Sequence, residues 1–520
     1  MSAGSTSIDD EDPAVSRPVG SQRRRERGFG SALGWTVAGA VVPGTGLLAA
    51  GRRKTGAVVL VVFLLLVAGG VWVLMAGQRA LVRAAVDTDR LLWIVGGAGL
   101  IALLWIVVII ASYRSLLPAH TSRGRHVLGG VLVLLLVLAV AAPAVEVGRL
   151  ALVQRDLIAG VFDGGKSATV VDKPDPFVGK PRLNVLLLGG DGGVGREGVR
   201  TDTVIVASID THTGDTTLIS LPRNLENLPF PAGSPLATAY PNGFEDGAED
   251  ESLLNAVYRN GPAAHPGILG PTDNPGADFL KLGVGEATGL HIDYYVLVNL
   301  AGFSRLVDAL GGITVNVNYY VPIGGEPTLK ILPDAYIAPG PDQHMNGARA
   351  LDFTRGRFGL TDYLRMARQR CAIKAIVEAA DPVTLLRQYQ ELAATTKDTV
   401  STDIPQSALN DFVDLAFRVK DASIRSVVFD QSLINPAYPD YDKIRRIVAD
   451  ALSPAPATAS SAGASSSSAA PSTGSPSTSA TPSGAPPTTN PVADVKDACA
   501  YDPAQAAAAR AAGEPPTRRR

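Results

Sequence analysis

Long apolar runs dominate the first 150 residues of the chain, and shorter apolar runs alternate with polar positions after them. Three of the early runs are each about the ~20 residues that an α-helix needs to cross the ~30 Å hydrocarbon core of a bilayer. The predicted spans are residues 56–76, 91–112 and 127–148. The pattern therefore predicts a multi-pass membrane region over residues 31–148, in the plasma membrane.

A fourth apolar stretch, residues 31–50, is broken by a proline and two glycines. Four arginines within residues 23–27 precede it, and residues 52–54 (Arg-Arg-Lys) follow it. A full crossing would leave one basic cluster outside, against the bias of basic residues for the cytoplasmic side. A re-entrant or interfacial hairpin keeps both clusters inside, makes residues 1–30 a basic cytoplasmic N-terminus and places the chain after residue 148 outside the cytoplasm. The alternative is a fourth span, with both ends of the chain inside.

Short apolar runs interleaved with helical patterns follow Asn184. They predict an α/β fold in which helices flank a central mixed β-sheet. The predicted strands are residues 184–190, 203–210, 216–222, 294–300 and 313–317. The predicted helices are residues 252–259, 277–289, 301–310, 346–353, 361–379, 382–396, 406–419 and 441–452.

Composition shifts divide the part after the spans into five segments. They are a stalk (149–183), the main α/β domain (184–380), a helical extension (381–452), a linker rich in Ser, Ala, Pro and Thr (453–491) and a C-terminal tail (492–520). The linker has too few apolar residues to offset the entropy of ordering, so we expect it to be disordered. The terminal run Arg518–Arg520 is expected to be a solvated end or to make a weak contact with an anionic polymer or lipid.

The charge balance excludes a protein that mainly coats nucleic acid. Lys and Arg number 47 against 49 Asp and Glu, which gives a net charge of -2. Such binding depends on an excess of basic residues that neutralise phosphates. We therefore expect no nucleic-acid partner.

Two cysteines exclude a disulfide-dense scaffold and a four-thiolate zinc site. The six histidines are scattered, so any bound metal should be held by oxygen. Cys371 and Cys499 both lie outside the cytoplasm in the predicted topology, where disulfides persist. A bond between them would pin the tail to the domain, and two free thiols are the alternative.

A Gly-rich loop follows the first predicted strand. Gly190, Gly192 and Gly195 spell the G-x-G-x-x-G pattern of dinucleotide-binding folds. That pattern requires a helix next, with its N-terminus on the pyrophosphate. Here another strand begins at Thr203 and leaves no room for a helix, so we reject a dinucleotide site.

Acidic and basic residues gather where the predicted strands begin and end. Asp191 follows the first strand, and Arg200 and Asp202 open the second. If these strands are neighbours, both carboxylates lie at one sheet edge and can share a hard cation such as Mg²⁺ or Mn²⁺. Arg223 follows the third strand and adds a guanidinium. Taken alone, these residues also fit exposed surface turns.

Further arginines recur after residue 350. Arg355 and Arg357 are two apart, so in an extended segment both would point to one face. Arg365 and Gln369 are four apart on a predicted helix, with Asp362 on the same polar stripe. Arginine suits bidentate recognition of phosphate. Exposed salt bridges would explain any one pair, but two acids and five arginines together favour a site for a divalent cation and a diphosphate.

The order of these motifs resembles the LytR-CpsA-Psr family from Asn184 to about Ile373. The motifs are N-V-L-L-L-G-G-D, R-T-D-T, S-L-P-R, L-L-N-A-V-Y, I-D-Y-Y-V-L-V-N-L-A-G-F, L-V-D-A-L-G-G-I-T-V-N-V, N-G-A-R-A-L-D-F-T-R-G-R and D-Y-L-R-M-A-R-Q-R. The multi-span N-terminus and the Ser/Pro-rich linker are similar to those of actinobacterial members.

The resemblance implies an enzyme, a phosphotransferase that moves a glycopolymer from a polyprenyl diphosphate carrier onto peptidoglycan outside the membrane. It implies that Asp191 and Asp202 hold magnesium and that the polyprenyl tail occupies an apolar cleft between sheet and helices. The residues it assigns to the diphosphate are Arg200, Arg223, Arg355, Arg357, Arg365 and Gln369, of which the first four are the candidate catalytic residues. Actinobacterial resemblance favours a polymer of the arabinogalactan type.

Two positions depart from the family pattern. Asn224 stands where an aspartate commonly follows Pro-Arg, so no role for an acid is carried over to it. Gly192 and Gly193 stand where a Ser/Thr-Arg pair often follows the first acid, so one diphosphate contact is missing or is supplied by Arg196 or Arg200.

Two other functions fit the same residues. One is a non-catalytic membrane protein that binds polyprenyl diphosphate or cell wall, and the other is a diphosphatase that acts on the carrier-linked glycan. Release of polyprenyl phosphate that depends on an acceptor separates the transferase from both. A transcriptional role fits badly with a domain outside the cytoplasm, a negative net charge and the lack of a helix-turn-helix pattern.

Overall fold

The computed structural model describes residues 28–75, 77–118, 121–162, 166–170, 177, 179–191, 199–380, 400–453 and 491–518. The chain forms two compact units, Met1–Gly70 with Ala98–Glu146, and Val71–Gly97 with Val147–Arg520. Several predictions lie outside the described residues: the basic N-terminus up to residue 27, the glycines that follow Asp191, the candidate contact Arg196, the helix 382–396, and the linker apart from residues 453 and 491.

Three of the described helices are long and apolar enough to cross a membrane. They are α3 (Arg53–Met75), α5 (Thr88–Leu116) and α6 (Arg123–Val161). α6 continues 13 residues past the predicted end of the third span at residue 148, so the first part of the expected stalk is helical. Ala151 and Ile158 of this extension are buried in an apolar cluster. Their packing stabilises the helix beyond the predicted span.

The broken stretch 31–50 forms two short helices, α1 (Phe29–Val41) and α2 (Thr45–Ala49). Neither has the length of a membrane span. The chain turns at Gly44, whose φ of 101° suits glycine and where a Cβ atom would lie 2.5 Å from the backbone oxygen of Gly56. The turn comes where the sequence predicts a hairpin.

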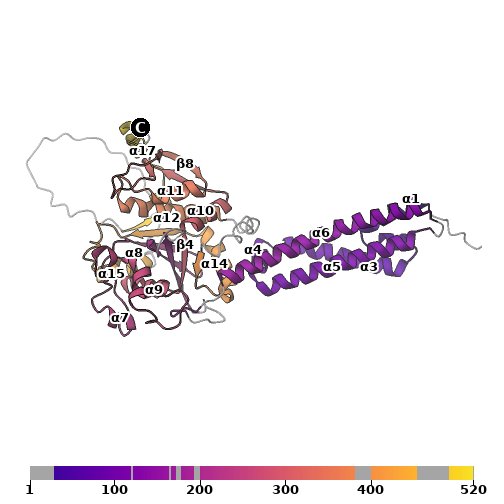
Figure 1. The fold of residues 1–520 in the computed structure, drawn as a ribbon, viewed down its shortest axis with the longest axis horizontal. Helices are drawn as coiled ribbons and strands as arrows, with labels where there is room; N and C mark the ends of the chain where they lie inside the picture. Colours follow the sequence, from indigo (N-terminus) through magenta and orange to yellow (C-terminus); the bar gives the residue numbers. More distant parts are fainter. Residues whose placement is uncertain are drawn as a thin grey trace, which may run out of the picture. The chain divides into compact units, whose positions relative to one another are not determined.

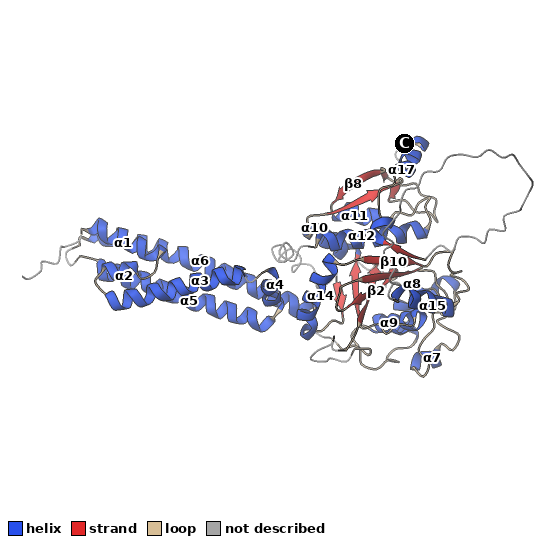
Figure 2. Cartoon of the chain, turned by 180° about the vertical axis from the view of Figure 1, so that it is seen from behind, coloured by secondary structure: helices blue, strands red, loops and turns tan. Residues whose placement is uncertain are grey.

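The α/β domain is built on a seven-stranded mixed sheet (Figures 1 and 2). Its strand order is β11-β10-β3-β2-β1-β4-β9. β2 runs antiparallel to both β1 and β3, whereas β4 is parallel to β1 and β10 is parallel to β3. The carboxyl ends of β1, β3, β4 and β10 therefore meet at one edge. The strands are β1 (Arg182–Gly190), β2 (Thr201–Asp210), β3 (Thr216–Leu221), β4 (Tyr294–Asn299), β9 (Val400–Thr402), β10 (Ile424–Val428) and β11 (Val492–Asp494).

Helices cover both faces of this sheet, because alternate residues of its buried strands point to opposite sides. Val204 and Val206 of β2 pack with α8 (Leu254–Ala264), α9 (Pro275–Thr288) and α15 (Tyr441–Leu452). Ile205 and Ala207 of the same strand pack with Ile373 of α12 (Asp362–Ala379). The predicted fold class, a central mixed sheet flanked by helices, is confirmed. The remaining helices of the domain are α7 (Pro235–Ala239), η1 (Glu249–Glu251), α10 (Leu300–Ala309), α11 (Gly347–Arg355), η2 (Gln406–Ala408) and α14 (Leu409–Asp421).

A smaller pair of two-stranded sheets lies apart from the central one. β5 (Ile313–Val317) pairs with β8 (Gly340–Met345), and β6 (Val321–Ile323) pairs with β7 (Ala335–Ile337). The strand predicted at residues 313–317 is thus confirmed with its bounds, but it lies outside the central sheet. These strands share their own core with α10, α11 and α12, around Val315 and Phe353.

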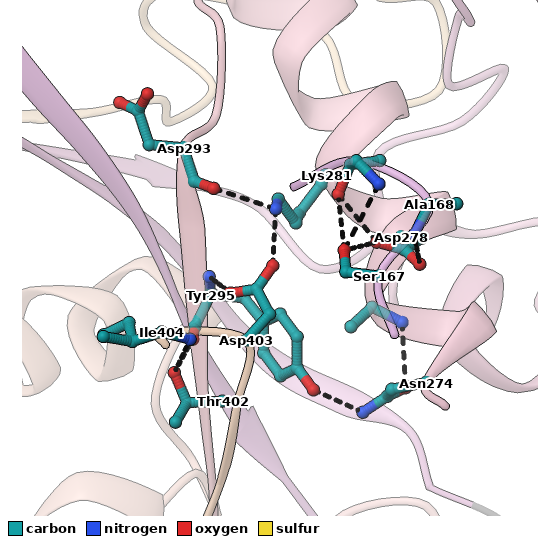
Figure 3. A network of polar contacts seen from close by, with 12 residues as sticks. Ser167, Ala168, Asn274, Asp278, Lys281, Asp293, Tyr295, Thr402, Asp403 and Ile404 are labelled. Atoms are coloured by element: carbon teal, nitrogen blue, oxygen red, sulfur yellow. Dashed lines mark hydrogen bonds and ion pairs between the residues drawn. The ribbon is translucent and has the colours of Figure 1, made fainter. Parts of the chain in front are cut away.

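Buried polar contacts anchor residues 166–170, which follow α6, to the first turn of α9 (Figure 3). The carboxylate of Asp278, 1% exposed, accepts hydrogen bonds from the side chains of Ser167, Thr169 and Thr272 and from the backbone N–H of Ala168. An acidic residue in the first turn is also favoured by the helix dipole.

A buried ion pair lies next to it. Lys281 of α9 binds Asp403 at 2.5 Å and the backbone oxygen of Asp293 at 3.0 Å (Figure 3). Asp403 also accepts from the backbone N–H of Tyr295. The pair therefore joins α9 to the chain that follows the edge strand β9.

The C-terminal tail packs on both sheet systems. β11 extends the central sheet beside β10, and α16 (Val495–Ala498) leads to Cys499, which forms a disulfide with Cys371 of α12. α17 (Pro503–Ala512) follows, and Arg510 donates to the backbone oxygen of Pro339. Arg518 is exposed, in line with a solvated end, and it also pairs with Asp334.

We expect the loss of the disulfide to destabilise the domain. The bond closes a loop with a sequence separation of 128 residues, which restricts the unfolded chain. Replacing both cysteines by serine should lower the free energy of unfolding by about 2–5 kcal/mol. Thermal melts of the full chain would measure this, with reduced wild type as a second route to the same state. Unchanged melting and unchanged proteolysis of the tail would contradict the prediction.

Candidate functional site

A cleft of about 480 Å³ opens between the carboxyl ends of β1 and β4 and helices α10, α11 and α12. One part of its wall is apolar, with Leu187, Val296, Phe303, Leu306, Ile376 and Val377. Another part carries Asp191, Asp202, Arg355, Arg357, Arg365 and Gln369. The structure therefore brings six of the eight predicted phosphate and metal residues to one cleft.

The pairing of β1 with β2 places the two aspartates. The strands are antiparallel neighbours, and Gly190 faces Thr201 after a register shift. Just beyond the paired strands, the backbone N–H of Asp191 donates to the oxygen of Arg200 at 3.1 Å, and the N–H of Arg200 donates to Asp191 Oδ1 at 2.8 Å. Both carboxylates thus lie at the same sheet edge, as the sequence predicts.

Asp202 is held by cations and an amide. Its Oδ1 accepts from Arg223 at 2.8 Å and from Asn255 at 3.3 Å, and Arg365 donates to its backbone oxygen at 3.0 Å. Burial alone would raise the pKa of Asp202, but the attraction and hydrogen bond of Arg223, with smaller contributions from Arg365 and Asn255, lower it below the usual value. Asp202 is therefore ionised near neutral pH.

A second carboxylate, that of Asp362, contacts two of the arginines. Arg365, 4% exposed, holds both oxygens of Asp362 at 3.0 and 2.9 Å, and Arg223 Nε lies 3.7 Å from Asp362 Oδ1. Thr361 caps this end of α12 by accepting from the N–H of Leu364. Acids and arginines thus alternate in space, which limits repulsion between the guanidinium groups.

Arg355 and Arg357 both line the cleft, but the expectation that they share an extended segment is wrong. Arg355 is the last residue of α11, and the chain leaves helical geometry at Gly356, with ψ 122°. A Cβ atom at Gly356 would lie 2.4 Å from the backbone oxygen of Pro322, so only glycine fits. Burial lowers the pKa of Arg357, and repulsion from Arg223 and Arg365 lowers it further.

Sequence reasoning missed Arg368, which holds the end of α11. Its side chain is 4% exposed. It donates to the backbone oxygens of Phe353 and Gly356 and to the hydroxyl of Tyr319. Arg368 therefore fixes the segment that carries Arg355 and Arg357. The signal available in the sequence was its spacing of three residues from Arg365, which puts both on one side of the helix.

Arg200 does not line the cleft in the part of the chain that the structure describes. Its guanidinium binds Glu251 at 2.8 Å and the backbone oxygen of Asp250 at 3.0 Å. Glu251 also accepts from Arg259 and Asn260. Hydrogen bonds from Asn260, Arg259 and Arg200 outweigh the effect of burial and lower the pKa of Glu251 to about 2. None of these partners was predicted, because they lie about 50 residues from Arg200 in the sequence.

Asp191 and Asp202 provide the kind of oxygen ligand that Mg²⁺ or Mn²⁺ prefers. Among the described residues, no group of three or more His, Cys, Asp or Glu side chains forms a complete metal site. An ion here would need further oxygens from a ligand and from water. This fits magnesium, which binds typically through one or two carboxylates plus phosphates.

The cleft combines an apolar wall with a group of arginines and aspartates. Such a wall excludes water and strengthens the attraction between guanidinium groups and an anion. The arrangement suits an amphiphile that has an apolar chain and a phosphorylated head.

A family model described as the LytR_cpsA_psr family matches residues 163–441, just over half of the chain. The teichoic acid transferase TagU of Enterococcus faecalis, named polyisoprenyl-teichoic acid–peptidoglycan teichoic acid transferase, is 28% identical over 291 residues, which cover 54% of this chain and 80% of the relative. The probable cell wall biosynthesis protein LcpB of Corynebacterium glutamicum is 32% identical over 204 residues, 39% of either chain.

Among solved structures, a chain from Streptococcus agalactiae, the protein gbs0355, is 26% identical with a TM-score of 0.36, and the match covers 48% of this chain and 77% of that one. The structure of TagT bound to LIIa-WTA is 19% identical with a TM-score of 0.35, over 56% and 96% of the two chains.

Replacing Glu251 by glutamine should change how stability depends on pH. A carboxyl group whose folded pKa lies below its ordinary value of 4.5 stabilises the fold above that pH and loses this effect as pH falls toward about 2. The melting temperature of the wild type should therefore exceed that of Glu251→Gln most at pH above 4.5, and the gap should narrow at lower pH. A gap that is constant from pH 6 to pH 3 would contradict the assigned shift.

Proposed function

The chain belongs to the LytR-CpsA-Psr family, and we propose that it transfers a glycopolymer from a polyprenyl diphosphate carrier to peptidoglycan. The names of the relatives support this, since TagU is called a teichoic acid transferase that acts on peptidoglycan. The observation that carries the proposal is the cleft itself, in which an apolar wall continues into arginines and aspartates. A prenyl chain fits the first part and a diphosphate the second.

In the proposed reaction, a hydroxyl oxygen of peptidoglycan attacks the phosphorus next to the carrier-linked sugar. The bond between this phosphorus and the bridging oxygen breaks, polyprenyl phosphate leaves, and the proton of the hydroxyl passes to solvent. Arg223, Arg357 and Arg365 would neutralise the charge that builds on the leaving phosphate. Arg355 and Gln369, which also line the cleft, would help to orient the head.

Asp191 and Asp202 would hold a magnesium or manganese ion against the diphosphate. Such an ion supplies Lewis-acid stabilisation of the phosphate charge. Arg223 has a further role here, because its contact keeps Asp202 ionised and therefore able to act as a ligand.

The polymer is proposed to be of the arabinogalactan type. The support is the resemblance of the spans and the Ser/Pro-rich linker to actinobacterial members. The relative LcpB of Corynebacterium glutamicum, named a probable cell wall biosynthesis protein, is in line with this.

The α/β domain is proposed to lie outside the cytoplasm. α4 (Gln78–Val86), in the loop between the first two spans, packs on α14, where Arg83 binds Asp414 and Arg79 lies 5.2 Å from the ring of Phe417. This loop and the domain are thus on the same side of the membrane. The arginines of the loop 113–126, which no acid accompanies, favour the cytoplasm for the opposite side.

Asp202→Ala and Arg223→Ala should each reduce transfer about 100-fold or more, because each removes a charge that stabilises the transition state. The assay measures magnesium-dependent release of polyprenyl phosphate with peptidoglycan as acceptor. Asp442→Ala and Arg445→Ala are matched controls, since these two residues form an ion pair on the surface of α15. Near-normal transfer in either site variant would contradict the assignment.

The same assay separates the other two functions. Release of polyprenyl phosphate without any acceptor would identify a diphosphatase, and binding with no release under either condition would identify a carrier-binding protein.

A reporter fused after Phe162, which follows α6, should be active only outside the cytoplasm. The reason is that three crossings from a cytoplasmic N-terminus place this residue outside. A fusion after Leu117, between the second and third spans, is the control and should report the cytoplasm. The reverse pattern would support the four-span topology.

A further inference from the structure

An exposed apolar cluster lies at the tip of the hairpin between β6 and β7. Leu329 is 70% exposed, Ile331 37% and Leu332 36%, and we call these three residues the tip cluster. Among the described residues after α6, the other large apolar side chain that is at least as exposed as Leu332 is that of Tyr438. Because clustered apolar side chains are unfavourable in water, the tip cluster indicates a surface that another molecule covers.

The hairpin that presents the tip cluster has a defined backbone. Glu326 and Ile331 exchange two backbone hydrogen bonds of 2.9 Å, and the N–H of Lys330 donates to the oxygen of Pro327 at 3.2 Å. Lys330 adopts a φ of 54°, which closes the turn. The backbone of the turn therefore determines the exposure of the tip cluster.

Two contacts hold the base of the β6–β7 hairpin. Gly356 packs against Pro322 at the end of α11, and Arg518 of the tail pairs with Asp334 and donates its backbone N–H to the oxygen of Pro333. The hairpin thus keeps a fixed position beside the segment that carries Arg355 and Arg357.

The hairpin is also part of the cleft wall. Pro322, Gly324, Gly325, Glu326 and Pro327 line the cleft, and the tip cluster begins two residues after Pro327. A chain that leaves the cleft along this wall would therefore pass the three apolar side chains next.

We propose that the tip cluster covers the part of the donor's prenyl chain that projects from the cleft. This rests on the proposed function and extends it, because it adds a subsite for the lipid outside the cleft. The hairpin would then select donors by chain length, since a short chain held within the cleft would not reach Leu329.

A single fluorescent label tests the proposal in the full chain in nanodiscs. Leu329→Cys provides the one free thiol among the described residues, because Cys371 and Cys499 are bonded to each other. With an environment-sensitive dye at this thiol, a long polyprenyl diphosphate should shift the emission to the blue. Geranyl diphosphate has the same head and a far shorter chain, so it should bind without the shift. Ala338→Cys, on the exposed turn between β7 and β8, is the labelled control and should respond to neither.

The outcomes separate this inference from the proposed function. If calorimetry shows that the wild type binds neither diphosphate, both fall. If the long polyprenyl diphosphate binds without a shift at residue 329, only the role of the hairpin falls. Emission that is already blue in the nanodisc before ligand is added would assign the tip cluster to the bilayer and overturn the proposal.

A kinetic readout gives a second test. Leu329→Gln should raise KM for a long-chain donor about tenfold, because an apolar contact is lost, and should leave kcat unchanged. KM for a geranyl-linked donor should not change, and neither KM should change in Ala338→Gln. Equal effects on both donors would show that the substitution disturbs the head-group site instead.

Discussion

The alternation of positive and negative side chains around Asp202 is the constraint on which the cleft depends. Arg223, Arg357 and Arg365 lie close enough to repel one another, and burial makes that repulsion stronger. Asp202 and Asp362 hold Arg223 and Arg365 in place, each through direct ion pairs or hydrogen bonds. A diphosphate that enters the cleft would bring its own negative charges to guanidinium groups that are already positioned, so little reorganisation is needed.

The backbone around the cleft supports this arrangement. The antiparallel pairing of β1 and β2 brings two aspartates that are 11 positions apart to one edge, and the parallel β3 delivers Arg223 to the same edge. Arg368 and Gly356 fix the end of α11 from the other side. Arg223 and Arg368 are not among the described residues that line the cleft, yet each sets the position of residues that do.

The sequence predicts the central part of the fold well and its periphery less well. β1 to β4 are apolar runs with turn residues at their ends, and each lies within two residues of its predicted bounds. β6, β7, β9 and β11 have three residues each, which is too short for any period to be recognised. The sheet to which β5 belongs could not be predicted, because its partner β8 is largely polar and pairing depends on contacts distant in sequence. In the site, acids and arginines at strand ends were predictable from local pattern. The partner of Arg200 and the role of Arg368 were not, because both depend on tertiary contacts.

The tail that carries β11, Cys499 and Arg518 is also the last part of the described chain to leave the ribosome. The sheet edge at β10, the site helix α12 and the base of the β6–β7 hairpin each gain a partner from it. Synthesis of the tail must therefore be complete before the domain reaches its final form. A nascent chain that still lacks the tail would have a folded core in which the sheet edge, α12 and the β6–β7 hairpin are without these contacts, so the last step of folding comes after the core has formed.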